Sequence, residues 1–330
     1  MKLSIILPTY NNEKTLYECL EALDKQDYSK KEYEILLIDG GSTDSTLEIA
    51  KKFNVRILKN PDRVEDAARI FALRIARGEI IALIDADNIV VGKDWIRKML
   101  EPFKDKEIFY ADTLYFACRS KDPMKVRYQA LIGGDDPLAT YLGFYSRWCY
   151  FKNNWTDFPY TYEKKKGHIK VKITDSNLIP TIGSNGFLIR KNLLRKFIKK
   201  TFTHPDYILE MVKKGYNCFA KVDTGIVHNQ PTFFKSKIRR IQRRLSGEIK
   251  IKYNYSLTKW KIIKTFLHIA TILPITYDII KGYINKPDSA WFFHYFACFG
   301  LIFIHGYYKL TGLFKRRKFF DIYDPEETSK

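Results

Sequence analysis

Cysteine is scarce in this chain of 330 residues, which contains five. The five are widely separated, and no two of them form a C-x-x-C pair. Zinc knuckles and disulfide frameworks depend on closely spaced cysteines, so the sequence indicates neither kind of site. Scattered cysteines of this sort are typical of a protein that folds in a reducing, cytosolic setting.

A long apolar run is missing from the first residues. The run at residues 3–7 is ended by Pro8 and is shorter than the apolar region of a secretory signal. A disordered chain is excluded as well, because 45% of the residues are hydrophobic. We therefore expect residues 4–7 to form a buried strand that opens a folded protein of one large or two small domains.

Acidic residues are outnumbered. The chain has 57 Lys and Arg against 37 Asp and Glu, which gives a net charge of +20. The excess is greatest in residues 231–330, which carry 19 basic and seven acidic side chains. Charge of this sign favours an anionic partner, and nucleic acid, a phosphorylated small molecule and a membrane face all fit it.

Strand-like and helix-like segments alternate in the first third of the chain. The predicted strands are residues 4–7, 34–38, 55–58 and 79–84. The predicted helices are residues 13–25, 44–52 and 64–75. Apolar side chains recur at helical spacing in the latter, and Asp44 is the expected cap of the second helix. Strands separated by such helices are typical of parallel β-α-β units, so the predicted fold class is α/β.

Polar residues follow three of the predicted strands. The first strand leads into PTYNN, the second into DGGSTD and the fourth into DADN. Because the carboxyl ends of parallel strands meet at one edge of a sheet, these groups are expected to collect there.

The carboxylates at this edge have two readings each. Asp85 and Asp87 are placed to hold Mg²⁺ or Mn²⁺, which would bridge to substrate phosphates. Alternatively they are turn carboxylates that cap a helix near Lys93. Asp39 either accepts hydrogen bonds from a base or ribose, or belongs to a tight turn that leads into a helix.

Five segments carry a family resemblance: SIILPTYNNEKTL, LLIDGGSTDSTLEIAKK, AARIFALRIARGEIIALIDADN, GSNGFLIRK and DYILEMVKKGY. In this order and spacing they resemble family 2 glycosyltransferases, and the resemblance covers roughly residues 3–230. It implies a GT-A nucleotide-binding domain with a central, mostly parallel sheet. It also implies an inverting transfer of a sugar from a nucleotide-sugar.

The resemblance assigns donor-binding roles to individual residues. The residues that would line the nucleoside pocket are Pro8, Thr9, Tyr10 and Glu13. Asp39 would read the base, although the family's paired carboxylates are reduced here to Asp39 and Gly40. Arg69 lies at the family's usual Ala-Arg-Asn step, where Ile70 replaces the asparagine.

The same resemblance implies a metal site. Asp85, Ala86 and Asp87 would be the D-x-D motif, with Asp85 nearer the ribose or sugar and Asp87 on the metal. A late histidine often completes this site in the fold, and His228 is the candidate. The alternative for His228 is a purely structural histidine.

The family's Glu-Asp dyad near the acceptor is not present as such. Asp206 in the segment 203–206 is the best match for the catalytic base. A positioned carboxylate can take the proton of an acceptor hydroxyl while the new bond forms, and a metal can neutralise the leaving diphosphate. The alternative for Asp206 is the N-cap of the following helix.

The last hundred residues differ from the rest. Arg239, Arg240, Arg243 and Arg244 would line one face of a basic helix. Apolar stretches follow at residues 262–280 and 290–314, with a turn at 282–289 between them and a basic cluster at 315–318 after them. Basic residues on both sides favour a membrane hairpin with both ends in the cytoplasm. The alternatives are an interfacial or re-entrant helix, and a helical pair packed on the catalytic domain without any membrane.

Residues 135–162 are dense in aromatic side chains. Aromatic rings stack on sugars, so the segment has one interpretation as an acceptor loop. A core element or a membrane-facing element explains the composition equally well.

Together these patterns predict a catalytic domain at residues 1–230 and a membrane-associated helical segment at 231–330. The predicted protein is a metal-dependent, inverting glycosyltransferase that uses a UDP- or GDP-linked sugar. Its acceptor would be a hydroxyl or a lipid phosphate on a glycan or a lipid-linked molecule. Membrane lipids are expected partners, the catalytic domain is expected to face the cytoplasm, and no nucleic acid is expected.

Two rival functions fit parts of the sequence. One is a nucleic-acid-binding protein, which is disfavoured because the basic residues gather around apolar helices and not on an aromatic platform. The other is a non-catalytic scaffold that binds sugar-nucleotides and has a degraded site.

Overall fold

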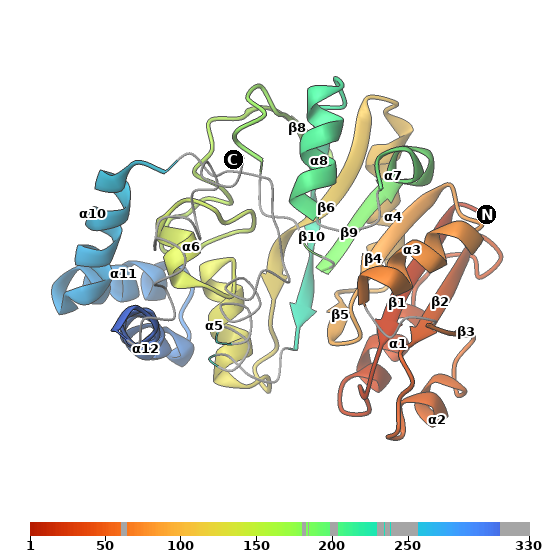
Figure 1. Ribbon diagram of the computed structural model, residues 1–330, viewed down its shortest axis with the longest axis horizontal. Helices are drawn as coiled ribbons and strands as arrows, with labels where there is room; N and C mark the ends of the chain where they lie inside the picture. Colours follow the sequence, from red (N-terminus) through yellow and green to blue (C-terminus); the bar gives the residue numbers. More distant parts are fainter. Residues whose placement is uncertain are drawn as a thin grey trace. The chain divides into compact units, whose positions relative to one another are not determined.

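The computed structural model describes residues 1–60, 65–179, 183, 185–198, 204–229, 234, 238 and 257–310 (Figure 1). The chain forms two compact units. Unit 1 comprises Met1–Ala117, Tyr160–Ser176 and Ile182–Asn229, and unit 2 comprises Cys118–Pro159, Asn177–Thr181 and Gln230–Lys330. Residues 118–159 therefore group with the C-terminal helices, while the domain boundary at residue 230 stays a prediction.

Unit 1 is built on one sheet of ten strands. The strands are β1 (Leu3–Thr9), β2 (Tyr33–Asp39), β3 (Arg56–Lys59), β4 (Ile80–Ile84), β5 (Asn88–Val90), β6 (Ile108–Ala117), β7 (Thr161–Lys165), β8 (His168–Lys172), β9 (Asn185–Arg190) and β10 (Cys218–His228). The helices are α1 (Leu16–Asp24), α2 (Thr46–Ala50), α3 (Glu65–Ile75), α4 (Trp95–Leu100), η1 (Glu101–Lys104), α7 (Lys191–Phe197) and α8 (His204–Lys213). The α/β class predicted from the sequence is confirmed.

The sheet is mixed, with the order β3-β2-β1-β4-β9-β6-β10-β8-β7. The first four of these strands are parallel, as the β-α-β pattern predicts, and β10 is parallel to β6. Strand β9 runs antiparallel between β4 and β6, and β5 pairs with the end of β10. Thr9 and Asp39 lie opposite each other in the ladder, so the carboxyl ends of β1 and β2 share one edge, as expected.

A buried ion pair joins β6 and β10. Lys221 lies opposite Asp112 in the parallel ladder, and its Nζ is 3.0 Å from Asp112 Oδ2. The two side chains are 1% and 4% exposed. A charge in such a place is tolerated only with its partner, so the pair fixes the register of the strand that ends in His228.

Some predicted element ends differ from the observed ones. The expected cap Asp44 lies one residue before the cap position Ser45, although its Oδ1 accepts a hydrogen bond from the Thr46 N–H at 3.0 Å. Gly78 ends the segment after α3 because a Cβ there would lie 2.4 Å from the backbone nitrogen of Ser4. Only glycine lets this turn pass so close to β1.

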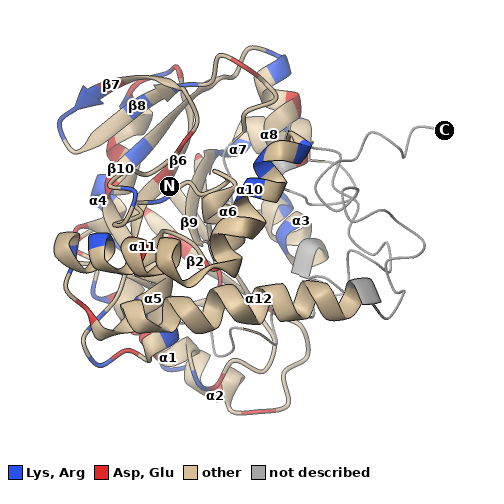
Figure 2. Ribbon diagram, turned by 90° about the vertical axis from the view of Figure 1, so that its left-hand side faces the viewer, with Lys and Arg blue, Asp and Glu red and all other residues tan. Residues whose placement is uncertain are grey.

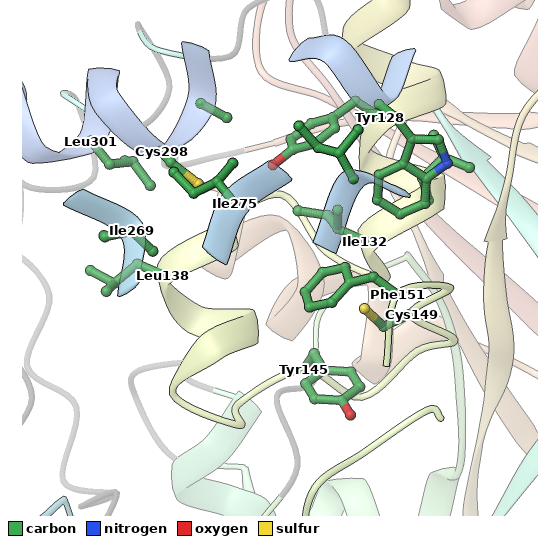
Figure 3. Close-up of a cluster of buried hydrophobic side chains, with 14 of the residues drawn as sticks. Tyr128, Ile132, Leu138, Tyr145, Cys149, Phe151, Ile269, Ile275, Cys298 and Leu301 are labelled. Atoms are coloured by element: carbon green, nitrogen blue, oxygen red, sulfur yellow. The ribbon is translucent and has the colours of Figure 1, made fainter. Parts of the chain in front are cut away.

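In the described residues of unit 2, the named secondary-structure elements are helices. Its helices are α5 (Met124–Ile132), α6 (Pro137–Tyr141), α10 (Lys259–Ala270), α11 (Ile272–Asn285), η2 (Ser289–Phe292) and α12 (Phe293–Leu310). Buried side chains from α5, α6, α10, α11 and α12 point toward one another in a single core (Figure 3). Residues from two distant parts of the sequence thus share one hydrophobic centre.

The predicted apolar stretch at 262–280 is two helices and not one. Helices α10 and α11 meet at a bend of 81°. Pro274 lies in the first turn of α11, where backbone N–H groups make no hydrogen bond within the helix, so proline is tolerated there. In a single continuous helix the same position would need an N–H donor, which proline lacks. The predicted turn at 282–289 is also shorter than expected, because α11 continues to Asn285.

A chain of polar groups crosses the interior of unit 2. The Tyr128 hydroxyl lies 2.6 Å from His294 Nδ1, and the Tyr141 hydroxyl lies 2.8 Å from His294 Nε2. Tyr141 donates to Asp278 Oδ2 at 2.5 Å, and His268 Nε2 lies 2.7 Å from the same oxygen. Burial, followed by the charge of His268, lowers the pKa of His294 to about 3, so the ring is neutral. The network links α5, α6, α10, α11 and α12.

The aromatic segment 135–162 belongs largely to this core. Phe144, Tyr145, Phe151 and Trp155 are buried, and Tyr141 packs against the same cluster. The composition therefore reflects packing within unit 2, which was one of the interpretations open from the sequence.

The predicted basic residues 239–244 and 315–318 lie outside the described residues. Within the described part, Ser289–Tyr308 is long and apolar enough to cross a membrane, with a mean hydropathy of 1.3. However, 44% of this stretch is buried inside the protein. Helices α10 and α11 reach the same criterion only as a bent pair.

Candidate active site

Hydrogen bonds tie together the loops that follow β1 and β2. Asn11, which has a φ of 51°, donates its N–H to Ser42 Oγ at 3.0 Å. Its side-chain Oδ1 accepts from the Thr43 N–H at 2.8 Å. The Glu13 N–H donates to Asp44 Oδ2 at 3.1 Å. These bonds hold the two loops in a fixed relation, and the first loop contains two of the predicted donor-binding residues, Tyr10 and Glu13.

The predicted base-reading residue, Asp39, is 5% exposed. Its carboxylate accepts hydrogen bonds from the N–H groups of Gly41 and Ser42 at 2.9 and 3.1 Å, and from Ser42 Oγ at 2.5 Å. Gly41 has a φ of 89°, a value that glycine adopts without strain. Asp39 therefore shapes the tight turn that the sequence also allowed. A base that binds Asp39 would contact a carboxylate that already accepts hydrogen bonds from Gly41 and Ser42.

Tyr10 and Glu13 reach solvent from the first loop. Tyr10 is 61% exposed, and Glu13 is exposed while its Oε2 accepts from the Ser45 N–H at 3.3 Å. Pro8 and Thr9 are the last residues of β1. The predicted nucleoside residues thus occupy one strand end and the loop beyond it.

Asp87 is the centre of a second cluster. His228 Nε2 lies 3.4 Å from Asp87 Oδ2, and Asn88 Nδ2 donates to Asp87 Oδ1 at 2.7 Å. The backbone also joins these segments, since the Asn229 N–H donates to the Asp87 carbonyl at 2.8 Å. The antiparallel pairing of β5 with β10 sets His228 opposite Asn88 and so delivers the imidazole to the carboxylate.

The electrostatics of this cluster favour an ionised Asp87. Burial raises the pKa of Asp87, but the charge of His228 and the hydrogen bonds from His228 and Asn88 outweigh it and lower the pKa overall. At neutral pH the side chain is therefore an anion in a partly enclosed place, which is the state needed of a metal ligand.

The other carboxylate of the motif, Asp85, is paired with a buried arginine. Arg69 Nη2 lies 2.9 Å from Asp85 Oδ1, and the side chains are 6% and 33% exposed. The positive charge of Arg69 also opposes the effect of burial on the pKa of Tyr207 in α8, which is raised overall. Ala86, between the two carboxylates, is buried.

Two buried polar atoms at this edge have no hydrogen-bond partner in the described part of the chain. They are the Thr9 hydroxyl and the Asn88 side-chain carbonyl. Buried polar groups are rarely left unsatisfied in a folded protein without a functional reason. Both lie at the strand ends where the donor-binding residues are expected, so both are suited to contact a bound ligand or its water.

The donor set at Asp87 suits a hard divalent cation with incomplete protein coordination. A carboxylate, an imidazole and the Asn88 carbonyl oxygen are oxygen- and nitrogen-containing groups of the kind that bind Mg²⁺ or Mn²⁺. No group of three or more His, Cys, Asp or Glu side chains in the described residues is arranged to hold a metal alone. A cation here would need ligands beyond these three groups, and diphosphate oxygens are suited to supply them.

The alternative capping interpretations are not supported by the structure. Helix α4 begins at Trp95 with Asp94 in the cap position, so neither Asp85 nor Asp87 caps it. Helix α8 begins at His204, so Asp206 is in its first turn and is not its N-cap residue. Asp206 is half-buried, and its proposed catalytic role stays a prediction.

The sequence analysis missed Asn88 and Cys19 as members of the site. Asn88 is fully buried and follows Asp87 directly, which was the available signal. Cys19 in α1 is buried with its Sγ 3.9 Å from the Asp85 carbonyl, and burial followed by Asp87 and Asp85 raises its thiol pKa. A cavity of about 170 Å³ is lined by Tyr33 and Ile35 at the opposite end of β2 from Asp39, away from this cluster.

Comparisons with known proteins identify the family and the fold of the chain. The family model described as Glycosyl transferase family 2 matches residues 4–197. The chain is 37% identical over 115 residues to poly(ribitol-phosphate) beta-N-acetylglucosaminyltransferase TarS of Staphylococcus aureus, an alignment of 33% of this chain and 19% of that protein.

A second relative is an archaeal enzyme of Methanococcus voltae, a dolichyl N-acetyl-alpha-D-glucosaminyl phosphate 3-beta-D-2,3-diacetamido-2,3-dideoxy-beta-D-glucuronosyltransferase. It is 34% identical over 109 residues, which are 31% of this chain and 34% of that protein. The chain thus aligns with only about a fifth to a third of the length of these relatives.

Among solved structures, the mannosyltransferase PcManGT from Pyrobaculum calidifontis, in complex with GDP-Man and Mn²⁺, has a TM-score of 0.53 at 16% identity. The superposition covers 94% of this chain and 87% of that one. At this identity the likeness shows the shared fold alone.

Proposed function

The chain belongs to glycosyl transferase family 2, and from this premise we propose that it transfers a sugar, with inversion, from a nucleoside-diphosphate-sugar to an acceptor. The observation that carries the proposal is the pairing of Asp87 with His228 beside the Asp85–Arg69 ion pair at the carboxyl edge of the sheet. Ionised and partly enclosed groups at such an edge are suited to a phosphorylated ligand.

The donor is proposed to bind across the ends of β1, β2 and β4. Pro8, Thr9, Tyr10 and Glu13 would hold the nucleoside, and Asp39 would position the loop beneath the base. Support comes from the tied loops and from the orphaned Thr9 hydroxyl. The nucleotide is UDP or GDP in this proposal, and the fold neighbour was solved with GDP-Man.

Mg²⁺ or Mn²⁺ is proposed to bind at Asp87 and His228, with donor phosphate oxygens as further ligands. When bound, the metal would supply positive charge to the leaving diphosphate. The residues of the chain do the rest. Arg69 holds Asp85 toward the ribose or sugar, and Asn88 orients the Asp87 carboxylate through its amide.

Asp206 is proposed as the general base. An acceptor hydroxyl is a poor nucleophile near neutral pH, and a carboxylate that accepts its proton during bond formation accelerates the reaction by about 10²–10⁴-fold. Its half-buried position in the first turn of α8 supports this assignment. The proton would move from the acceptor oxygen to a carboxylate oxygen of Asp206.

The acceptor is proposed to be a hydroxyl or a lipid phosphate on a glycan or lipid-linked molecule. We further propose that residues 231–330 attach the protein to membrane lipids and that the catalytic domain faces the cytoplasm. The apolar stretch Ser289–Tyr308 supports the attachment. The relatives are named for poly(ribitol-phosphate) and dolichyl-phosphate substrates, which is consistent with polymer or lipid acceptors.

The test is a screen of nucleotide-sugars against the full-length protein in detergent, with release of nucleoside diphosphate as the readout. Asp87→Ala and excess chelator should each abolish release. Asp223→Ala, which removes an exposed aspartate of the same strand as His228, is the matched control and should be fully active. Full activity of Asp87→Ala, or in chelator, would defeat the metal proposal.

The same screen separates the rival functions. A non-catalytic scaffold would bind a donor without releasing diphosphate from any of them. Family membership gives no support to nucleic-acid binding, and neither does the placement of the described lysines on apolar helices.

A further inference from the structure

Helix α12 is apolar on its exposed face as well as on most of its buried face. Between Phe293 and Tyr308, every exposed residue is aromatic: Phe296, Phe299, Phe303 and Tyr307. They recur at spacings of three and four and so form one stripe. Between Phe293 and Tyr308 the helix contains no Lys, Arg, Asp or Glu, and this part is drawn in tan in Figure 2. Its polar side chains His294 and Cys298 instead face the interior of unit 2, where they are fully buried.

The two neighbouring helices also present apolar side chains outward. In α11, Ile272, Leu273, Tyr277 and Ile284 are each more than 60% exposed. In α10, Trp260 and Leu267 are 70% and 60% exposed. The exposed large hydrophobic residues of the described chain are concentrated in these three helices. Contiguous exposed apolar surface of this kind marks an interaction site.

The exposed charged side chains of residues 257–308 have one sign. Five lysines lie exposed between residues 257 and 308: Lys259, Lys261, Lys264, Lys281 and Lys286. The acidic residues of that segment are both engaged elsewhere. Asp278 belongs to the buried network, and Asp288 pairs with Arg127 at 2.9 Å. A partner that meets this surface is therefore apolar and carries negative charge, which describes an anionic lipid surface.

Helix α12 is not free to leave unit 2 and span a bilayer. His294 connects it to Tyr128 and Tyr141 by hydrogen bonds, and Trp291 just before it is fully buried. A spanning position would expose these polar groups to hydrocarbon or break their bonds, and either is costly. An in-plane position keeps the network and buries only the aromatic stripe.

We infer that α10, α11 and α12 lie flat in the interface of an anionic membrane, with their apolar side chains in the acyl region and no span. This inference rests on the membrane attachment proposed above and specifies its mode. Interfacial helices of this type bury their apolar face by about 5–10 Å. The exposed side chains suit this depth, because Phe, Trp and Leu are typical of the apolar face of interfacial helices and the rings of Tyr and Trp are favoured near head groups.

Binding is measured first, with full-length protein and sedimenting vesicles. Vesicles that contain phosphatidylglycerol should bind at least about tenfold more tightly than phosphatidylcholine alone, since each lysine near an anionic surface contributes about fivefold. High salt should remove that preference but not detach the protein. Phe296→Asp combined with Phe303→Asp should abolish binding to both. The control Tyr162→Asp, at a 55% exposed aromatic residue on β7, should bind normally.

Depth is measured second, with nitroxide labels at Phe296→Cys and Tyr307→Cys. The native thiols are buried except for half-buried Cys118, which is replaced by serine. An in-plane helix places both labels at the same depth. A spanning helix separates them by about 16 Å, because eleven residues rise 1.5 Å each.

Equal, shallow depths support the inference, and a depth difference near 16 Å overturns the in-plane mode while leaving membrane attachment intact. Absence of binding to either vesicle, or a dimer that hides the labels in solution, overturns attachment itself. Neither readout depends on catalysis. The inactive variant Asp87→Ala should bind and report the same depths, so failure of the enzymatic proposal is recognised separately.

Discussion

Replacing Gly282 by alanine should destabilise unit 2, although alanine is the better helix former. Gly282 lies inside α11, and a Cβ built on it would lie 2.4 Å from Cζ2 of the Trp291 ring. Trp291 is fully buried, and its Nε1–H donates to the Lys286 carbonyl at 2.9 Å. The ring therefore has no empty space to move into without losing a bond.

The magnitude follows from these contacts. Helix propensity alone would favour alanine by about 1 kcal/mol. Overpacking of a full core costs about 1–3 kcal/mol, and displacement of the indole from its carbonyl partner costs about 1 kcal/mol more. We expect the free energy of unfolding of Gly282→Ala to fall by about 1–3 kcal/mol.

Gly306 provides the matched control. It lies in α12, and a Cβ there would meet no heavy atom within 4 Å. In Gly306→Ala only the higher helix propensity of alanine should act, so the free energy of unfolding should rise by about 0.5–1 kcal/mol. Urea titrations of the two variants, followed by circular dichroism and tryptophan fluorescence, measure whether the free energy of unfolding falls in the first and rises in the second. If Gly282→Ala proves as stable as the wild type while Gly306→Ala behaves as expected, the packing of Trp291 on α11 is wrong.

Three further outcomes are expected. Lys221→Met should lower the free energy of unfolding by about 3–5 kcal/mol because it leaves Asp112 buried without its partner, and adding Asp112→Leu should recover most of that loss in urea titrations. The pKa of His294 is lowered from 6.5 to about 3 in the folded chain, so between these pH values the imidazole is protonated in the unfolded chain and neutral in the folded one. Stability should be complete above pH 6.5 and fall between pH 6.5 and about 3, by roughly 1 kcal/mol per pH unit for this group, and His294→Gln should flatten that slope. Asp206→Asn should keep donor affinity, measured by calorimetry, but lower turnover by about a hundredfold or more, and turnover near wild type would place the base elsewhere.

The sequence predicted the parallel half of the sheet well. Short apolar runs such as residues 34–38 and 79–84 are unambiguous when helices of regular spacing separate them. The segment GSNGFLIRK carries the family resemblance, but its sequence does not predict strand β9. The antiparallel place of β9 between β4 and β6 depends on pairing with residues about a hundred positions earlier. Local patterns carry no information about such pairing.

The helical unit shows a second limit of sequence patterns. The apolar composition of α12 predicts a helix that could span a membrane, but hydropathy counts composition and not the direction of the side chains. Which side chains face inward was decided by His294, whose partners come from α5 and α6. A buried polar network of this kind cannot be predicted from one helix alone.

The candidate site was foreseen in its parts. Asp85, Asp87, Arg69 and His228 were named from a family resemblance, and the structure pairs Asp85 with Arg69 and Asp87 with His228. The engagement of the Asp39 carboxylate with its own turn was weighed only as an alternative, because hydrogen bonds to backbone N–H groups leave no mark in the sequence.

The insertion of β9 beside β4 has a consequence for synthesis on the ribosome. Strand β4 is wholly buried and apolar, yet one of its edges stays unpaired until β9 has been made. At about 5–20 residues per second, the roughly one hundred intervening residues take about 5–20 s to emerge. During that time the nascent chain exposes an unpaired strand edge, and such edges promote aggregation by pairing with strands of other chains. The yield of soluble protein should therefore depend on translation speed between β4 and β9, and on chaperones that cover the open edge.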